Sequence, residues 1–380
     1  MKKKVIVISN FHEEISISRS NMASNYFLSR KFDTTTLYSS FSHSLKKNRY
    51  LKNKNCVSIS TISYKSSLSL KRIFSYFIFT FNVYRYLRNV KADIIYLNLP
   101  PNILALAVFL NRDKKSKIII DILDLWPESY PNDSALKKIV FLVLGIIPKQ
   151  IRKHAIKNSD FCITESELFY NQLKLKNKAN SKIIYLKKFQ KTQPLFSEVS
   201  KDFSIVYLGN IGEIYDFDSL FKIIKGVEKS RSIHLHIIGL GPMSDWFFER
   251  LKKNNIKYTN HGATFDEEVK NEILSSCWFG FNGYKQSTEV ALSYKSIDYL
   301  SSGVPLLNSA KEDTFKIVSQ NNIGFNFDCG NLDNLIESLS ITSKNDIIEM
   351  KRKAYQVFCD KFSGESYYDE MDSVIEHVYN

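Results

Sequence analysis

The chain has 380 residues, of which 44% are hydrophobic, 24% charged and 13% aromatic, and its 53 basic and 39 acidic side chains give a formal charge of +14. This length suits two domains, and the aromatic content together with only 13 glycines and 8 prolines excludes disordered, collagen-like and linker-dominated chains. The positive charge either suits a polyanion (nucleic acid, anionic lipid or a phosphorylated substrate) or reflects a compositional bias that spreads lysine everywhere.

Three further patterns narrow the class of protein. Five scattered cysteines without a CxxC pair indicate free thiols in a reducing compartment and argue against a disulfide framework or a zinc site. No run of Lys and Arg is long enough for a nucleic-acid-binding arm, so nucleic acid is not a predicted partner. The basic start at residues 2–4 is followed by too short an apolar stretch for a signal peptide, so residues 4–9 predict a first buried strand.

Short β-branched runs alternate with longer helical patterns over the first half of the chain. Strands are predicted over residues 4–9, 33–38, 92–97, 117–123, 161–164 and 182–185. Helices are predicted over 20–30, 68–89, 103–110, 134–159 (continuing past Pro148) and 165–173. This alternation predicts an α/β domain over residues 1–190, with a parallel sheet covered by helices on both faces.

Two of the predicted helices contain apolar segments between basic residues, IFSYFIFTFNVY at 73–84 and IVFLVLGII at 139–147. Neither approaches the ~20 apolar residues of a membrane-spanning helix. Each is either a buried helix with basic ends or an interfacial helix whose apolar face enters a bilayer while its cations meet anionic headgroups. The prediction is a cytoplasmic protein, peripheral at the inner face of the cell membrane if the second interpretation holds.

Residues 187–201 lose periodicity and predict an interdomain linker, after which the alternation restarts. Strands are predicted over 203–208, 233–238, 256–260, 278–281 and 305–308. Helices are predicted over 217–228, 243–254, 266–275, 292–301, 332–339, 347–358 and 367–379. Two similar domains joined by one linker predict a cleft lined by the carboxyl ends of the strands, where open α/β sheets bind ligands.

Three strand-to-helix turns of the second half could bind a ligand. In YLGNIG, Gly209, Asn210 and Gly212 allow close backbone approach before a helix start that suits phosphate. In HIIGLGP, Gly239 and Gly241 shape a turn that could hold a nucleobase or ribose. Each of these two turns alone could equally be an ordinary tight turn.

The third turn, in SYKSIDYLSSGVP, places Lys295 and Asp298 three residues apart on one helix face. A cation beside helix-start amides can hold a diphosphate, and a nearby carboxylate can accept hydrogen bonds from ribose hydroxyls. The alternative for this pair is a surface salt bridge.

In order along the chain, YLGNIG, HIIGLGP, HGATFDEEVKNEILSSCWFGFNGY and SYKSIDYLSSGVPLLNS resemble glycosyltransferase family 4, the retaining GT-B nucleotide-sugar transferases of bacterial polysaccharide, capsule and O-antigen synthesis. The resemblance covers essentially the whole chain and is strongest over 203–330. DILDLWPES at 121–129 also resembles a loop of polysaccharide-building members. The tail resembles the C-terminal helix that crosses back to the first domain. The resemblance implies a GT-B fold, with an acceptor-binding domain at 1–190 joined by tail 360–380 and a nucleotide-sugar-binding domain at 201–359.

The resemblance also implies roles for residues of the second domain. The family carries a Glu-x7-Glu pair whose second acid contacts the ribose, and Asp298 matches it. The first acid would fall at Val290, one residue after Glu289, so Glu289 and Lys295 are the candidate catalytic residues. Relatives place an Arg and a Lys after the first strand of this domain. Glu213 and Asp216 occur there instead, so Lys295 and the 210–212 backbone must hold the diphosphate, with Lys285 as a supplement.

The candidate acceptor-binding residues lie in the first domain and are His12, Glu13, Asp124 and Glu128. His12 is either a base or, more simply, a surface-loop histidine, and His234 and His236 are interpreted as structural. Asp121 and Asp124 are three residues apart, but no DxD motif is present and GT-B relatives generally need no metal, so neither a metal nor a cofactor is predicted.

The predicted function is transfer of a sugar from a UDP-, GDP- or dTDP-sugar to a lipid-linked glycan with retention of configuration. A GT-B-fold sugar-nucleotide epimerase is one alternative. A glycan-assembly partner that kept the fold and lost catalysis is another, because the cation pair is missing and Glu289 is displaced.

Overall fold

The computed structural model describes residues 2–13, 18–65, 69–126, 135–190, 193–194, 196, 199–200, 202–264 and 266–379, with the backbone alone for 135–144. The chain forms two compact units. The first contains Met1–Leu186 and Tyr367–Asn380, and the second contains Lys187–Ser366. Each unit is built around its own parallel sheet, which confirms the predicted pair of α/β domains.

The first unit has a seven-stranded sheet in the order β5-β2-β1-β6-β7-β8-β9, and every neighbouring pair is parallel. Its strands are β1 (Lys4–Ser9), β2 (Asp33–Ser39), β5 (Cys56–Ile59), β6 (Ile94–Leu99), β7 (Lys117–Ile122), β8 (Phe161–Thr164) and β9 (Ser181–Ile183). A small antiparallel pair, β3 (Phe41–Ser42) and β4 (Lys47–Asn48), stands beside it.

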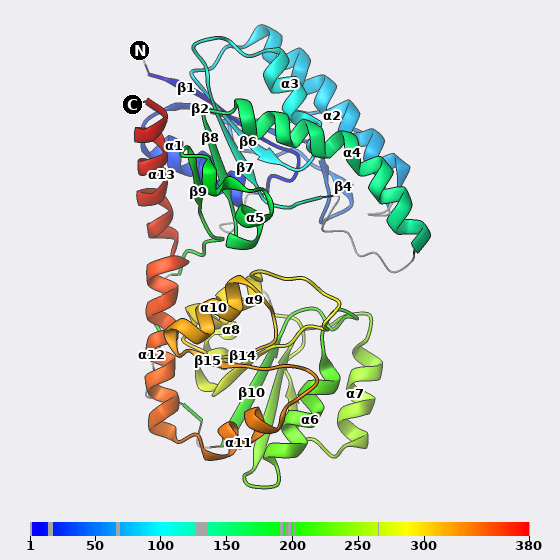
Figure 1. Cartoon of the computed structure of the whole chain (residues 1–380), viewed down its shortest axis with the longest axis vertical. Coiled ribbons are helices and arrows are strands. Elements are labelled where there is room, and N and C mark those ends of the chain that lie inside the picture. The colour runs from blue at the N-terminus through cyan, green and yellow to red at the C-terminus, as the bar shows by residue number, and fades with distance from the viewer. Residues whose placement is uncertain are drawn as a thin grey trace. The chain divides into compact units, whose positions relative to one another are not determined.

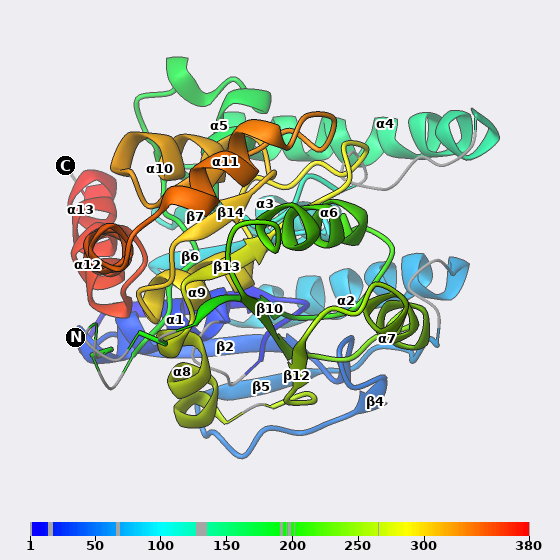
Figure 2. The ribbon, with the colours of Figure 1, turned by 90° about the horizontal axis from the view of Figure 1, so that it is seen from below.

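Helices cover both faces of this sheet, as the alternation predicts. They are α1 (Arg19–Ser29), α2 (Leu70–Asn89), α3 (Leu104–Leu110), α4 (Ala135–Asn158), α5 (Glu167–Gln172) and α13 (Gly364–Tyr379), with a 3₁₀ turn η1 (Leu175–Asn177). On one face α3 lies between α2 and α4 (Figure 1 and Figure 2). On the other face α1 packs with the part of α13 that begins at Tyr367, so the chain's last helix completes the core of the first unit.

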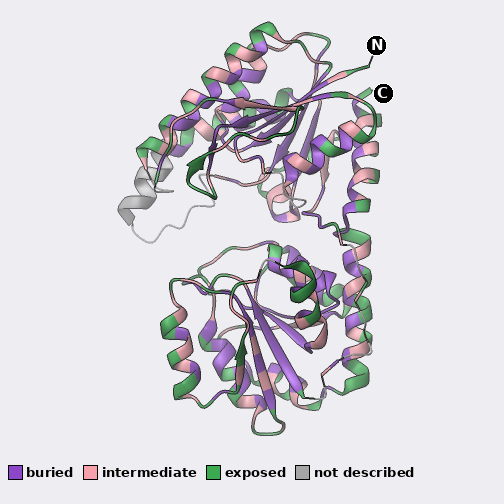
Figure 3. Ribbon diagram, turned by 180° about the vertical axis from the view of Figure 1, so that it is seen from behind, coloured by how far each residue is buried: buried purple, intermediate pink, exposed green. Residues whose placement is uncertain are grey.

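The second unit has a six-stranded parallel sheet in the order β12-β11-β10-β13-β14-β15. Its strands are β10 (Phe203–Leu208), β11 (Ile233–Ile238), β12 (Tyr258–Asn260), β13 (Phe279–Asn282), β14 (Leu306–Asn308) and β15 (Gly324–Asn326). Its helices are α6 (Phe217–Val227), α7 (Ser244–Lys253), α8 (Glu267–Ser276), α9 (Tyr294–Ser301), α10 (Asp313–Asn321), α11 (Asp333–Ile341) and α12 (Lys344–Lys361). The central strands of both sheets are largely buried (Figure 3), as parallel strands between two helical layers must be.

The structure adds elements that the sequence patterns did not indicate. Strand β5 is a half-buried edge strand, and helix α10 with strand β15 forms one more βα repeat at the other sheet's edge. These segments are short and only partly apolar, so their periodicity is weak. No helix among the described residues is long and apolar enough to cross a membrane.

Candidate functional site

Two glycine-containing loops follow the neighbouring strands β10 and β11, and their contact explains the glycines. A Cβ atom on Gly239 would lie 1.9 Å from the Gly209 carbonyl oxygen, and one on Gly241 would lie 2.3 Å from the Ile211 carbonyl oxygen. The Gly209 amide also donates a hydrogen bond to the Ile238 carbonyl at 2.9 Å. These glycines therefore allow two loops to pack backbone against backbone at the carboxyl edge of the sheet, where ligands bind in such folds.

We expect Gly239→Ala to lower the free energy of unfolding by about 2 kcal/mol or more, because the new methyl group would overlap the Gly209 carbonyl. Gly262→Ala is the matched control. Gly262 has a φ of +68°, but a Cβ atom there meets nothing within 4 Å, so only backbone strain of about 1 kcal/mol remains. Urea unfolding measures both variants, and equal losses would contradict the role given to the loop contact.

The remainder of the first loop leads into α6. Asn210 is exposed, and its carbonyl oxygen accepts a hydrogen bond from the Tyr207 hydroxyl at 2.5 Å. Gly212 is buried beside the Asn210 side chain. The Asp216 carboxylate caps α6 by accepting the Ser219 amide at 3.1 Å. Asp216, which lies where the family resemblance leads us to expect a cation, thus has a structural role as a helix cap.

Lys295 lies in the first turn of α9, and its side chain ends among three tyrosines. The ring centroids of Tyr215, Tyr284 and Tyr207 lie 3.9, 4.5 and 5.2 Å from the Lys295 Nζ atom. Lys295 is only 7% exposed, and no hydrogen-bond acceptor of the described residues is within reach of Nζ. Burial lowers the pKa of the Lys295 ammonium well below the usual value of a lysine. The ring faces attract the charge, but they do not replace the three hydrogen bonds of an ammonium group.

This tyrosine cage (Tyr207, Tyr215 and Tyr284) is formed where two loops meet. Tyr207 is near the end of β10, Tyr215 is in the loop that follows, and Tyr284 is the second residue after β13. Tyr215 and Tyr284 pair as an isolated β-bridge, and the Lys285 amide donates to the Ile214 carbonyl at 3.0 Å. The cage and the glycine loops therefore share the carboxyl ends of the central strands of the second unit.

Asp298 lies three residues beyond Lys295 on α9 but has different neighbours. Its carboxylate pairs with Lys188 at 2.5 Å and with Lys270 at 3.4 Å, and Glu267 pairs with the same two lysines at 2.9 and 2.5 Å. Burial by itself would lower the pKa of Lys188, but Asp298 and Glu267 outweigh it and raise that pKa. The two lysines likewise lower the pKa of Glu267 against its own burial. Asp298 thus belongs to a four-residue charge network (Lys188, Glu267, Lys270 and Asp298), and Lys295 does not.

The other two donor-side candidates lie in the loop between β13 and α9. The side chains of Lys285 and Glu289 are both exposed, whereas Val290 is half-buried. Lys285 is next to the cage residue Tyr284, so its ammonium group is the exposed cation nearest in sequence to the cage. The exposure of Glu289 does not test its predicted catalytic role, which therefore stays a prediction.

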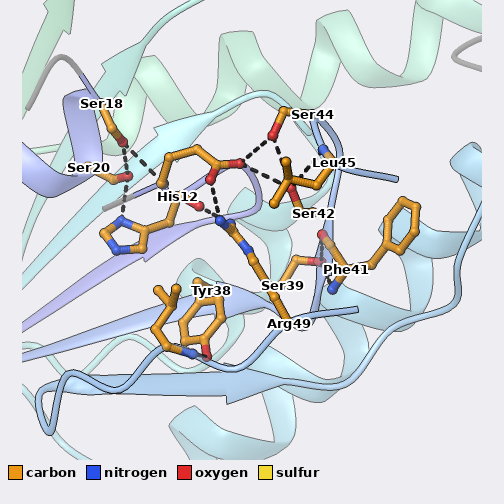
Figure 4. Close-up of polar contacts among 12 residues, drawn as sticks. His12, Ser18, Ser20, Tyr38, Ser39, Phe41, Ser42, Ser44, Leu45 and Arg49 are labelled. Carbon is orange, nitrogen blue, oxygen red and sulfur yellow. Dashed lines mark hydrogen bonds and ion pairs between the residues drawn. The ribbon is translucent and has the colours of Figure 1, made fainter. Parts of the chain in front are cut away.

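His12, the first acceptor-side candidate, is buried and is not a surface-loop histidine, which corrects the simpler of the two interpretations. It is 1% exposed, and its Nδ1 atom lies 2.8 Å from the Ser20 hydroxyl (Figure 4). Its Nε2 atom lies 3.9 Å from the Cys56 thiol. Burial, with the nearby charge of Arg49 as a smaller cause, lowers the pKa of His12 to about 4. His12 is therefore neutral at neutral pH.

This lowered pKa predicts a loss of stability in acid. The folded His12 has a pKa near 4 and an unfolded histidine one near 6.5, so the unfolded chain binds the extra proton between these values. The free energy of unfolding should therefore be unaffected by His12 above about pH 6.5. It should fall by about 3 kcal/mol in total as the pH falls toward 4. Urea unfolding from pH 7 to 4 should show a flatter slope for His12→Gln, and identical slopes would contradict the assignment.

Glu13 is held by a cluster of polar residues of the first unit. Its carboxylate is paired with Arg49 and accepts hydrogen bonds from the hydroxyls of Ser44 at 2.9 Å and Ser42 at 3.3 Å. These three partners are labelled in Figure 4. Arg49 also donates to the His12 carbonyl. Glu13 therefore fixes the 12–13 backbone to the β3–β4 hairpin, and the next residues, 14–17, lie outside the described residues.

Asp124, Asp121 and Glu128 come from one segment but differ in position. Asp124 is half-buried after β7, near Tyr76. Asp121 is fully buried and paired with Arg19 at 2.8 Å, so it is a core residue. Glu128 lies outside the described residues. Within the described part of the chain, no three His, Cys, Asp or Glu side chains gather as they would around a metal ion.

The two strand histidines are half-buried and face other polar groups. The His234 Nε2 atom lies 2.8 Å from the Thr259 hydroxyl, and the His236 Nδ1 atom lies 3.0 Å from the Nε2 atom of His261. Burial, and then the neighbouring histidines, lowers the pKa of His236 to about 4. These contacts join β11 to the end of β12.

The sequence patterns missed most partners of the candidate residues. Lys188 lies in the aperiodic stretch that predicts a linker, yet it is 6% exposed and belongs to the second unit. The spacing of Glu267 and Lys270 does place them on one face of α8, so the helical pattern held a usable signal for that pair. Nothing in the local sequence marks the three tyrosines of the cage.

Comparison with known proteins identifies the fold. No protein-family model matches the chain, and no curated protein matches it in sequence. Solved structures do match. HepE of Anabaena in complex with UDP and glucose is 12% identical with a TM-score of 0.66, over 98% of this chain and 99% of that one. Sucrose-phosphate synthase from Thermosynechococcus elongatus is 12% identical with a TM-score of 0.72, over 100% and 99%. The lipopolysaccharide outer core galactosyltransferase WaaB is 14% identical with a TM-score of 0.60, over 98% and 99%.

These similar structures have the GT-B fold, and the likeness extends over nearly the whole length of both chains in each comparison. At such low identity it concerns the arrangement of elements and not the side chains of the site. The chain therefore has the GT-B fold, as the sequence motifs predict.

Proposed function

We propose that this protein is a glycosyltransferase that moves a hexosyl residue from a nucleoside-diphosphate sugar to a glycan acceptor, and that it belongs to the retaining family 4. The observation that carries the proposal is Lys295, a buried cation without a hydrogen-bond partner among the described residues, at the carboxyl ends of β10 and β13 beside the glycine loops. A diphosphate would supply the oxygen atoms that the tyrosine cage does not. HepE structures contain UDP and UDP-glucose, which makes uridine the first nucleotide to test.

Each candidate residue then has a role in the transfer. Lys295, with the backbone of Asn210–Gly212, stabilises the charge that develops on the departing diphosphate. Asp298 binds the ribose, Gly239 and Gly241 hold their loop against the 209–211 backbone so that the two loops together can contact the nucleoside, and Lys285 supplements the charge. No metal or cofactor is needed in this scheme.

The reaction is substitution at the anomeric carbon with retained configuration. The bond from this carbon to the diphosphate oxygen breaks and a bond to the acceptor hydroxyl oxygen forms, through a short-lived oxocarbenium-like species. The proton of the acceptor hydroxyl passes to the leaving phosphate. Glu289 is proposed to approach the donor sugar, and His12, Glu13, Asp124 and Glu128 are proposed to contact the acceptor.

Binding of the donor requires local rearrangement of the second unit. The Lys295 Nζ atom is enclosed by the tyrosine cage, and Asp298 is already paired with two lysines. We propose that the 209–216 and 283–285 loops separate at the Tyr215–Tyr284 bridge when the diphosphate enters. Ribose hydroxyls would then share the Asp298 carboxylate with Lys188 and Lys270.

We also propose that the acceptor is a lipid-linked glycan of capsule or O-antigen synthesis, used by a peripheral protein at the cytoplasmic face of the membrane. WaaB, a lipopolysaccharide galactosyltransferase by its name, supports an acceptor of this class. The basic charge of the chain supports an anionic surface.

Calorimetry with UDP, GDP and dTDP and their sugars tests the donor, followed by product analysis with polyprenyl-diphosphate glycans. Saturable binding and a new glycan are expected. Absence of binding to every nucleotide would overturn the proposal. Conversion of a sugar nucleotide without acceptor would indicate an epimerase instead.

A second candidate is a non-catalytic assembly partner that binds a nucleotide sugar. The pairing of Asp298 with two lysines and the capping role of Asp216 favour it, because both acids serve the structure of the second unit. Nucleotide binding without transfer to any acceptor of the panel would support this candidate.

A further inference from the structure

Helix α2 carries two apolar faces, and only one of them is packed in the core. Phe79, Val83 and Leu87 face the sheet and are buried. Leu70, Phe74, Phe77 and Phe81 recur every three or four residues on another face, and they are 81%, 59%, 51% and 58% exposed. A row of four large apolar side chains, each more than half exposed, is unusual on a water-facing helix.

The neighbouring helices extend this apolar row. Helix α3 lies between α2 and α4 (Figure 2), and it exposes Leu106 and Leu110 by 37% and 73%. Helix α4 exposes Ile146 and Ile147 by 56% and 69%. Residues Leu70, Ile73, Phe74 and Phe77, with the Lys71 stem, also line an open hollow on α2. Exposed apolar side chains therefore occur on all three helices of this layer among the described residues.

The charge of the same layer points to the chemistry of its partner. Helix α2 contains four basic residues, α4 contains six, and the sequences of α2, α3 and α4 contain no acidic residue. The whole chain, by contrast, carries 39 acidic residues among 380. On α2 the cations stand near the two ends of the apolar row, with Lys71 and Arg72 directly after its first residue, Leu70, and with Arg85 and Arg88 beyond its last residue, Phe81.

We propose that α2 lies on an anionic lipid bilayer, with Leu70, Phe74, Phe77 and Phe81 among the acyl chains and Lys71, Arg85 and Arg88 at the headgroups. Exposed phenylalanines gain by leaving water, and cations at both ends of the row gain from anionic headgroups. This surface would bring the first unit to a lipid-linked acceptor, so it deepens the proposed function. It does not involve the donor residues of the second unit.

Vesicle flotation of the full chain tests the proposal, using phosphatidylcholine vesicles with and without phosphatidylglycerol. The wild type is expected to bind the anionic vesicles more tightly. Phe74→Ser, Phe77→Ser and Phe81→Ser together are expected to weaken binding about tenfold or more. Arg85→Gln with Arg88→Gln should weaken it roughly fivefold per charge at low salt, and less at high salt.

The control is a triple variant, Tyr50→Ser, Phe315→Ser and Ile341→Ser, in other parts of the chain. These three apolar side chains are about as exposed as those of the row on α2, at 80%, 49% and 78%. It should bind vesicles like the wild type, and thermal unfolding confirms that each variant is folded. Equal vesicle binding by the phenylalanine variant, or no binding by the wild type, would overturn the proposal.

Light scattering provides a further test. The proposal would be overturned if the wild type were a dimer and the phenylalanine variant a monomer, since the surface would then join two copies of the chain. Nucleotide binding measured without vesicles separates this outcome from a failure of the proposed transfer, because the α2 variants leave the second unit unchanged.

Discussion

Lys295→Met is expected to lower sugar transfer by a factor of about 10² to 10³ while leaving the protein as stable as the wild type or more stable. The loss of activity follows from the proposed task of Lys295, because removing one preorganised group that stabilises developing charge typically has an effect of this size. Methionine nearly matches the length and volume of the lysine stem and keeps contact with the rings of Tyr207, Tyr215 and Tyr284.

The effect on stability follows from the burial of Lys295. Its Nζ atom has no hydrogen-bond acceptor within reach among the described residues, so the folded state loses the hydration of an ammonium group without replacing it. Because burial lowers its pKa, the unfolded chain binds more protons than the folded one between the lowered and the ordinary value. Wild-type stability should therefore rise with pH over this range, and the advantage of the methionine variant should shrink toward alkaline pH.

Turnover with the identified donor and urea unfolding at neutral and alkaline pH measure the two effects. Lys285→Met is the matched control, because Lys285 is an exposed cation next to the cage residue Tyr284. This variant should change the stability little, and it should lower the rate of sugar transfer less than Lys295→Met does. Near-normal turnover of Lys295→Met would remove Lys295 from the donor site. A large loss of stability would instead make Lys295 a structural cation held by the rings.

The fold could be predicted because its signals are local. Strand β7 reads KIIIDI and is buried along nearly its whole length, and such runs between helical patterns mark a parallel sheet wherever they occur. Helix α4 continues through Pro148, as its pattern on both sides of the proline indicates. Strand β5, with the sequence CVSI, was missed because an edge strand is half-exposed and carries no strong pattern.

The candidate site could be predicted only where a loop carries its own signal. The glycines of 209–212 and 239–241 identified the two loops, but the reason for Gly239 is the Gly209 carbonyl, which a distant part of the chain supplies. The pairing of Lys188 with Asp298 joins residues 110 positions apart, and no pattern of one sequence contains such a contact. His12 looked like a loop histidine because the residues that bury it, such as Arg49 and Cys56, follow much later in the chain.

Asp121→Ala is expected to lower the free energy of unfolding of the first unit by about 3–5 kcal/mol, because it leaves the buried Arg19 cation without its carboxylate. The Arg19 Nε atom lies 2.8 Å from Asp121, and its other nitrogens donate to the Ile184 and Tyr185 carbonyls at 2.6 and 2.8 Å. Asp121 also accepts the Tyr96 hydroxyl at 2.5 Å.

The matched control for Asp121→Ala is Arg30→Met, which breaks the Arg30–Asp372 pair on the surface of the same unit and leaves Asp372 its hydrogen bond from the Tyr26 hydroxyl at 2.7 Å. Arg30 and Asp372 are 41% and 39% exposed in their side chains, so water and salt screen the pair and its loss should cost less than about 1 kcal/mol. Chemical unfolding of both variants gives the two values. The combined change Arg19→Met and Asp121→Leu should be milder than the single variants added together, because no unpaired charge remains in the core. Equal losses at the buried and the exposed pair would contradict the assignment of Asp121 as a core residue that holds α1 to β7.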